Sequence, residues 1–285
     1  MKLSIHGVGL AAPIGDGALV RQALDGKDVP LPAAYETPTE ALAEYVPARK
    51  LRRMDHFTRM TLLAAYRALE AADTLSVLPD RMGIVLGTGY GPSRTTFDFQ
   101  DSLIDDGPAL ASPLAFSLSV HNIPAGVLSM LLDYPCPQTT LCQLRGVVQA
   151  GTQTAALWLA EGRVDTILLG FTDETTPLLE ANTERLNAAE GRLDAPPVGE
   201  GSAFFLLAEA GGFASLEIEA RPENFKADTV VIDQGEFGTC DLTDLWGKSP
   251  TSCGLELAAA ALGAREQELK TACREGDVWF SVIGE

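Results

Sequence analysis

The segment Pro137–Leu157 constrains the fold of this chain more than any other stretch. It reads PQTTLCQLRGVVQAGTQTAAL, which predicts a short strand over 138–141, a tight turn, and a helix over 146–161 that is rich in small residues. A buried strand is expected next, over 166–170, and strand, helix and strand in that order form a right-handed parallel crossover. Because strands and helices also alternate along the rest of the sequence, the predicted class is α/β.

Other parts of the chain supply the remaining elements of such a fold. Asp55 is expected to cap a helix that runs to about Ala72, because its carboxylate can accept the unpaired N–H groups of the first turn. Ala64 and Ala68 share one face of this helix, and small side chains there indicate close packing against another element. Residues 25–48 predict an irregular surface segment. Further strands are expected over 3–8, 82–86, 203–207, 216–219, 229–233 and 278–283, and further helices over 117–132 and 253–262.

Composition excludes several kinds of protein. The 285 residues are 46% hydrophobic and 21% charged, as in ordinary globular proteins, and no apolar run approaches the ~18 residues that a membrane span needs. The start of the chain lacks the pattern of a signal peptide, so a cytoplasmic protein is expected. Five cysteines without a CxxC pair, beside only three histidines, predict buried free thiols and no metal site.

Neither nucleic acid nor a nucleotide cofactor is expected as a ligand. A net charge of −18 opposes binding to phosphate backbones. The glycine-rich loop Gly87–Gly91 matches neither GxxxxGK[ST] nor a GxGxxG that leads into a helix, so no cofactor is predicted. One basic run, Arg49–Arg53, interrupts the acidic pattern. A solvated turn at the start of a helix is the favoured interpretation of that run, and a docking patch for a partner is the alternative.

Five segments, in the expected order, resemble the β-ketoacyl synthase family. They are Leu51–Ala72 (family helix RRMDRFT), Met82–Gly89 (GIVxGTG), Ser119–Ser129 (SVxNxxAGxxS), Asp165–Glu174 and Val198–Glu209 (GEGAxxxxLE). The resemblance implies a thiolase-like, layered αβαβα fold. It covers most of residues 1–210, which would form the N-terminal half with a degenerate nucleophile elbow, and leaves 211–285 as a shortened C-terminal half of the same fold.

The same resemblance implies that three catalytic positions are degenerate. In the family, a cysteine three residues before the glycine that opens the helix accepts the acyl chain, and two histidines assist decarboxylation of the extender unit. Counting back from Gly146 gives Gln143, whose amide cannot form a thioester. The histidine positions correspond to Gln234 and Lys248, so no catalytic residue is predicted. The histidines of the chain are His6, His56 and His121, all in its first half.

Cys142 keeps an active enzyme open as an alternative. A shift of one residue would make it the nucleophile of a β-ketoacyl-ACP synthase, but its side chain would then turn toward the other side of the elbow. No imidazole in the second half would be available to activate it. Arg145 also departs from the family, which has small residues at that position for close helix packing.

Family members with glutamine in place of the cysteine include chain-length factors, which pair with an active β-ketoacyl synthase and help to bound the acyl tunnel. The resemblance therefore implies a catalytically silent subunit of a heterodimer, a pseudoenzyme in polyketide or fatty-acid-like biosynthesis, of the aryl polyene type. Its partners would be the active synthase and, indirectly, an acyl carrier protein. A homodimeric acyl-binding scaffold is the remaining alternative. Residues expected at the dimer surface or acyl pocket are Val120, Asn122, Ile123, Val127, Met130 and Leu141.

Overall fold

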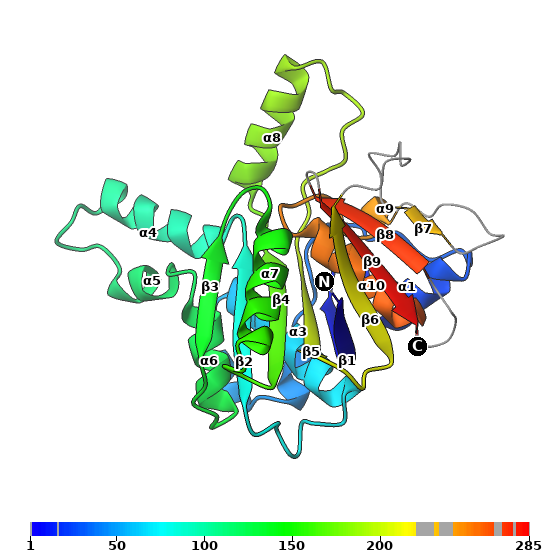
Figure 1. Cartoon of the computed structure of the whole chain (residues 1–285). Coiled ribbons are helices and arrows are strands. Elements are labelled where there is room, and N and C mark those ends of the chain that lie inside the picture. The colour runs from blue at the N-terminus through cyan, green and yellow to red at the C-terminus, as the bar shows by residue number, and fades with distance from the viewer. Residues whose placement is uncertain are drawn as a thin grey trace.

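The computed structural model describes residues 2–15, 17–220, 231–233, 242–264, 270–275 and 278–284. Its strands are β1 Lys2–Ala11, β2 Met82–Thr88, β3 Gln138–Cys142, β4 Thr166–Asp173, β5 Gly201–Ala208, β6 Ala214–Ala220, β7 Val231–Asp233, β8 Lys270–Glu275 and β9 Val278–Gly284. They form one sheet in the order β3-β2-β4-β5-β1-β6-β9-β8-β7 (Figure 1). Strand β2 pairs in parallel with both β3 and β4, and the other described pairs are antiparallel.

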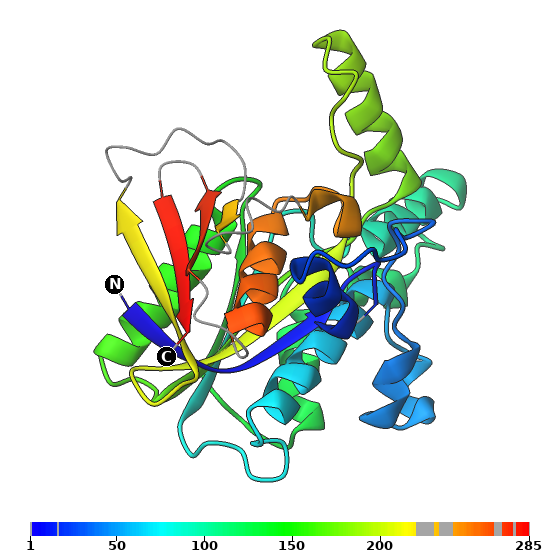
Figure 2. The same cartoon turned by 90° about the vertical axis from the view of Figure 1, so that its right-hand side faces the viewer.

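Helices cover both faces of this sheet. They are α1 Gly17–Leu24, the 3-10 helix η1 Glu40–Glu44, α2 Ala48–Leu51, α3 His56–Ala71, α4 Ser93–Asp105, α5 Pro113–Leu118, α6 Ile123–Leu131, α7 Val147–Ala160, α8 Pro177–Ala189, α9 Thr243–Trp246 and α10 Ser252–Ala264. Helices α3 and α6 pack on one face, and α7 and α10 on the other. Helices α4, α5 and α8 project away from the sheet (Figures 1 and 2).

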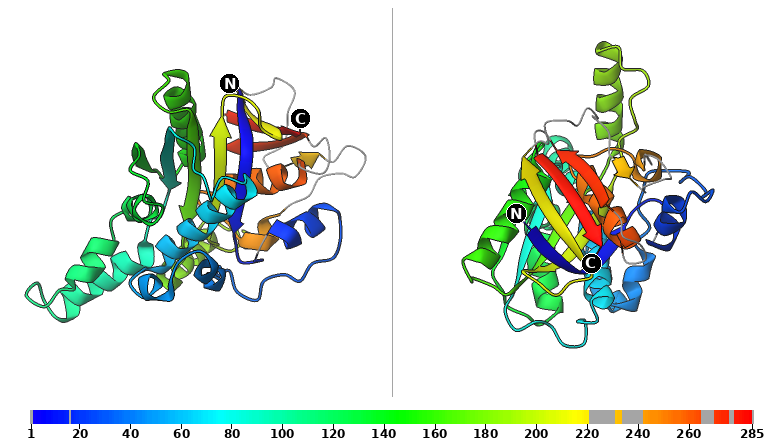
Figure 3. Two further views of the ribbon diagram at one scale, coloured as in Figure 1. Left: turned by 90° about the horizontal axis from the view of Figure 1, so that it is seen from below. Right: turned by 45° about the vertical axis from the view of Figure 1, so that its right-hand side comes forward.

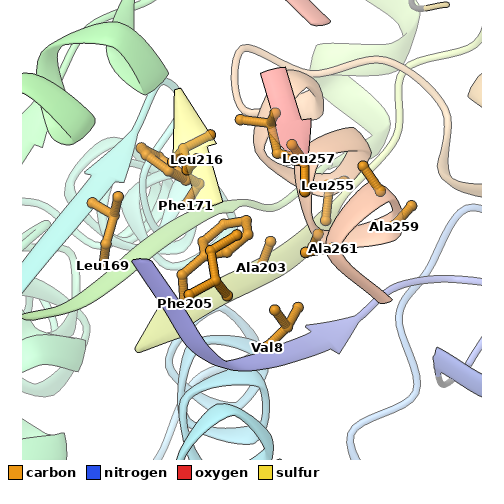
Figure 4. Packing of buried hydrophobic residues seen from close by; sticks show 14 of the residues in the cluster. Val8, Leu169, Phe171, Ala203, Phe205, Leu216, Leu255, Leu257, Ala259 and Ala261 are labelled. Carbon is orange, nitrogen blue, oxygen red and sulfur yellow. The ribbon is translucent and has the colours of Figure 1, made fainter. Parts of the chain in front are cut away.

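Helix α10 lies in the middle of the fold. It contacts β1 and β5 and, further along the curled sheet, β8 and β9 (Figure 3). Every residue from Ser252 to Ala264 is buried, as expected for a helix that is apolar on all sides. Its leucines and alanines pack against Phe171, Ala203 and Phe205 (Figure 4). The layering of helix, sheet, helix and strands agrees with the predicted thiolase-like α/β fold.

The packing of α3 on β1 follows directly from small residues. Asp55 caps α3 as predicted, accepting a hydrogen bond from the N–H of Thr58 at 3.3 Å. On the strand side, a Cβ added to Gly9 would overlap the backbone carbonyl oxygen of Ala64, and one on Gly7 that of Ala68. Glycines on the strand and alanines on the helix therefore permit a backbone approach that larger residues would prevent.

Several expectations need correction. The single helix expected over 117–132 is two helices, since α5 ends at Leu118 and α6 begins only at Ile123. Pro124 lies in the first turn of α6, where it is favoured, and it has no N–H group to donate to the carbonyl oxygen of Val120, as a continuous helix would require. The cysteines also differ from the expected buried free thiols: Cys253 is disulfide-bonded, and although Cys136 and Cys142 are free, Cys136 is half-buried and Cys142 is exposed. Within the described ranges, no helix is both long and apolar enough to cross a membrane.

Candidate functional site

The predicted turn between strand and helix forms an elbow over residues 142–146. Strand β3 ends at Cys142, and Gly146 precedes α7 with φ at 75°, in the left-handed region where a side chain would be strained. Gln143 follows β3 directly, and its N–H donates to the carbonyl oxygen of Thr88 at 3.0 Å. Gln143 is exposed, and its Oε1 lies 3.9 Å from the position of a Cβ on Gly146. The amide therefore lies at the surface of the elbow.

The environment of Cys142 does not activate its thiol. Its Sγ lies 3.8 Å from the carbonyl oxygen of Gly89, a weak donor contact. Burial and the nearby negative charge of Asp173 raise the pKa of the Cys142 thiol. Because the thiolate is the nucleophilic form, a raised pKa lowers reactivity at neutral pH. The geometry disfavours Cys142 as an acyl acceptor.

A buried carboxylate that sequence reasoning missed connects the segments around the elbow. Asp173, at the end of β4, is 0% exposed. Its Oδ1 accepts hydrogen bonds from the Thr88 hydroxyl at 2.8 Å and from the N–H groups of Gly89 and Tyr90 at 2.8 and 2.7 Å. Its Oδ2 accepts one from the N–H of Thr251 at 3.1 Å. Burial raises the pKa of this carboxyl, and the hydrogen bonds oppose that shift.

An open pocket of about 730 Å³, here called the elbow pocket, joins two parts of the predicted site. Leu144 and Arg145 line it from the elbow, and Lys248 lines it from the loop before α10. The backbone of Lys248 is fixed by a donated hydrogen bond to the carbonyl oxygen of Pro197 at 2.8 Å. The structure thus brings the predicted second histidine position next to the elbow. Gln234, assigned to the first histidine position, lies outside the described residues.

Residues 27–190 match the family described as "Beta-ketoacyl synthase, N-terminal domain". The chain belongs to the β-ketoacyl synthase family. Its curated relatives include proteins named 3-oxoacyl-[acyl-carrier-protein] synthase 2. The one from Synechocystis is 24% identical over 61% of this chain, and one from Staphylococcus aureus is 23% identical over 81%. The chain spans only 44% and 62% of the lengths of these two relatives.

Solved structures share the β-ketoacyl synthase fold over the whole chain. The ishigamide ketosynthase/chain length factor has a TM-score of 0.76 at 18% identity and is covered to 99% of its length. The ketosynthase ApeO in complex with its chain length factor ApeC, from Xenorhabdus doucetiae, has a TM-score of 0.63 at 16% identity, with 99% of that chain covered. At these identities the likeness establishes the fold, which is thiolase-like as predicted.

Two histidines of this chain, His6 and His121, contact the backbone of neighbouring segments. The Nε2 atom of His6 lies 3.0 Å from the carbonyl oxygen of Ala210. The ring of His121 lies over Gly91, where an added Cβ would overlap it, and burial lowers the pKa of this imidazole. Gly91 therefore makes room for His121 on the loop that follows β2.

The third histidine supports a fully buried carboxylate. The Nε2 atom of His56 lies 2.6 Å from Oε1 of Glu200, which is 0% exposed. The same oxygen accepts a hydrogen bond from the N–H of Thr37 at 2.7 Å, and Oε2 accepts one from the N–H of Thr175 at 3.1 Å. This network joins four segments of the chain, and His56 is one of its members.

Glu174 is a third fully buried acid. Its Oε1 accepts a hydrogen bond from the N–H of Arg94 at 2.9 Å, and its Oε2 has no partner within the described part of the chain. Burial, with smaller contributions from the negative charges of Asp55 and Glu200, raises the pKa of Glu174 to about 8. The carboxyl is therefore largely protonated at neutral pH.

The predicted dimer-surface residues lie along one side of the molecule. Strand β3 is an edge strand of the sheet, so one row of its backbone groups is unpaired within the described structure. Val120 is 44% exposed and Met130 is 72% exposed. Asn122 is also exposed, whereas Ile123, Val127 and Leu141 are half-buried. A groove of about 330 Å³ on this side is lined by Ile123, Val127 and Met130, and also by Lys50 and Arg53 of the basic run.

Proposed function

We propose that the chain is a non-catalytic, ketoacyl-synthase-like subunit, a chain-length factor, that pairs with an active β-ketoacyl synthase. In the pair it would shape the acyl pocket for polyketide or fatty-acid-like biosynthesis, of the aryl polyene type. The observation that carries the proposal is Gln143 on the elbow, where the family's cysteine would accept the acyl group. A glutamine amide offers no nucleophile for thioester formation, so chemistry would belong to the partner.

The open edge of β3 supports a pairing role. An unpaired edge strand is a template for a second chain. Exposed apolar side chains flank it: Met130 is 72% exposed and Leu144 is 66% exposed. Exposed apolar side chains beside an unpaired strand edge suit a protein interface. A partner laid against β3 would cover these side chains and extend the sheet.

Helices α4 and α5 and the loop between them also expose apolar side chains, which support the same proposal. They project from the sheet near the β3 side (Figure 1), with Phe99 and Phe116 in contact at 5.2 Å between ring centroids. Ile104, Leu110 and Leu114 are 78%, 72% and 60% exposed. Apolar side chains held outward on a projecting arm suit contact with a partner or with an acyl chain in the partner's pocket.

The test is native mass spectrometry of the tagged chain, gently purified from its own host. A one-to-one complex with a synthase that retains cysteine and both histidines is expected. In that complex Gln143→Ala and Cys142→Ala should keep condensing activity, while replacement of the partner's nucleophilic cysteine should abolish it. A homodimer that carries an acyl thioester on Cys142 would instead establish an active synthase. A homodimer without a thioester would favour the alternative that the chain is a homodimeric acyl-binding scaffold.

A further inference from the structure

Helices α4 and α8 project from the sheet and are attached to it mainly through their first turns (Figures 1 and 2). The buried residues of α4 are Ser93 and Thr95, both in its first turn. Helix α8 has no buried residue, although Thr175 and Thr176, which precede it, are only 5% and 4% exposed. A helix without a buried face gains little stability from tertiary packing along its length. The contacts at the two first turns therefore determine how both helices are held.

Two consecutive residues after β4, Glu174 and Thr175, contact both of these helices. Oε1 of Glu174 accepts a hydrogen bond from the N–H of Arg94 at 2.9 Å. The carbonyl oxygen of Glu174 accepts one from the hydroxyl of Ser93 at 3.3 Å. On the other side, the hydroxyl of Thr175 donates to Oε1 of Glu180 in α8 at 3.4 Å. Glu174 and its neighbour thus connect the end of β4 to the first turns of α4 and α8.

The surroundings of Glu174 disfavour its ionised form. The side chain is 0% exposed, and burial is the main cause that raises its pKa to about 8. The negative charges of Asp55, before α3, and Glu200, before β5, add to this effect. The N–H and the guanidinium group of Arg94 oppose it but do not outweigh burial. Further charged or titratable side chains next to this cluster are Glu36, His56, Asp173 and Glu180.

Ionisation of Glu174 would favour an opening at this point of the fold. A buried carboxylate without a full set of partners lowers its free energy by reaching water, and Oε2 of Glu174 has no partner in the described part of the chain. Separation of the first turn of α4 from the end of β4 would break the contact with Arg94 and admit water to the carboxylate. Because α4 and α8 have few other buried contacts, such an opening would not require the core to unfold.

We propose that Glu174 is a proton-dependent anchor: in its protonated form it holds the first turns of α4 and α8 against the sheet, and in its ionised form it releases them. The two projecting helices would then sample other orientations as pH rises, while the sheet and the helices packed on it keep their arrangement. The proposal goes beyond pairing with a synthase and does not depend on it.

Hydrogen exchange of the full chain, followed by mass spectrometry at pH 5.5, 6.5 and 7.5, tests the proposal. Rates are expressed as protection factors, which remove the intrinsic effect of pH on exchange. Between the ordinary pKa of 4.5 and the raised value of about 8, opening that exposes Glu174 becomes up to about tenfold more favourable per pH unit. Protection in α4 and α8 should therefore fall at least roughly tenfold from pH 5.5 to pH 7.5. Helix α1, which packs on α10, should change by less than a factor of about two.

Matched variants assign the effect to one carboxyl group. Glu174→Gln keeps an acceptor for the N–H of Arg94 but cannot ionise, so protection in α4 and α8 should no longer depend on pH. Glu184→Gln removes an exposed carboxylate from α8 itself and should retain the full dependence.

Three results would overturn the proposal. The first, which needs no variant, is constant protection of α4 and α8 in the unmodified chain. The second is an equal fall in α1, which would indicate loss of stability of the whole fold rather than local release. The third is an unchanged pH dependence in Glu174→Gln. Because the measurement uses the chain alone, failure to pair with a synthase would not alter its outcome.

Discussion

At the scale of single residues, hydrogen bonds to buried carboxylates connect the chain segments beneath the elbow. Asp173, Glu174 and Glu200 are each 0% exposed. The sequence does not show what these carboxylates hold, because their partners are distant along the chain: Asp173 bonds to residues 85 positions before it and 78 after it. Gln143 could be located in advance, because the strand, the turn and Gly146 follow local rules and the resemblance to the family then implies the count back from Gly146.

Removal of the His56 side chain should destabilise the fold strongly. His56→Ala would leave Oε1 of the buried Glu200 without its side-chain partner, and loss of one partner of a buried pair costs about 3 to 5 kcal/mol. Urea denaturation followed by circular dichroism measures the loss. His6→Ala, at an exposed contact, is the control and should cost less than about 1 kcal/mol. A loss below about 1 kcal/mol for His56→Ala would show that the pair contributes little.

Glu174 should make stability depend on pH. Its pKa rises from the ordinary 4.5 to about 8 in the folded chain, so the folded state holds this proton more tightly than the unfolded state. The stabilisation is full below pH 4.5 and is lost as pH rises through 8, with a slope of up to about 1.4 kcal/mol per pH unit from this group. Glu174→Gln should remove that slope. Unfolding free energies at pH 5, 6.5 and 8 test it, and parallel curves for the two proteins would contradict it.

At the scale of elements, sequence patterns located most strands and helices but not their interruptions. The pattern over 117–132 predicts one helix because apolar residues recur throughout it, yet the structure breaks it between Leu118 and Ile123. Pro124 has no N–H group to donate to Val120, so a helix that continued through this stretch would lose that hydrogen bond despite the hydrophobic periodicity. Helix α8 was not predicted, and it has no buried residue to produce an apolar face.

The contact between α3 and β1 should not tolerate even one added methyl group. Gly9→Ala would place a Cβ against the backbone carbonyl oxygen of Ala64, and the strand and helix would have to separate. Overpacking of this kind costs at least about 1 to 3 kcal/mol. Gly126→Ala in α6 is the matched control, because nothing lies within 4 Å of its added Cβ and alanine favours helix. Thermal unfolding should therefore show a lower melting temperature only for Gly9→Ala.

At the scale of the whole molecule, exposed apolar side chains are unevenly distributed over the surface. The net charge is −18, yet the side that carries the β3 edge exposes Val120, Met130 and Leu144. An acidic surface keeps copies of the chain apart elsewhere, and the apolar side offers a partner both a strand edge and contact area. The proposed association would use the same strand that ends the sheet and leads into the elbow.

Charges placed on this side should abolish association and leave the fold intact. Val120→Glu with Met130→Glu adds carboxylates at positions that are 44% and 72% exposed, so the isolated chain can solvate them. In a complex they would be buried without partners, and the dissociation constant should rise by at least roughly tenfold. Val77→Glu, at a residue 77% exposed on the loop after α3, is the control and should leave assembly unchanged. Sedimentation velocity measures the assembly. If the double variant assembles as tightly as the unmodified chain, the partner must use a different face, and the exposed edge of β3 must be covered in another way.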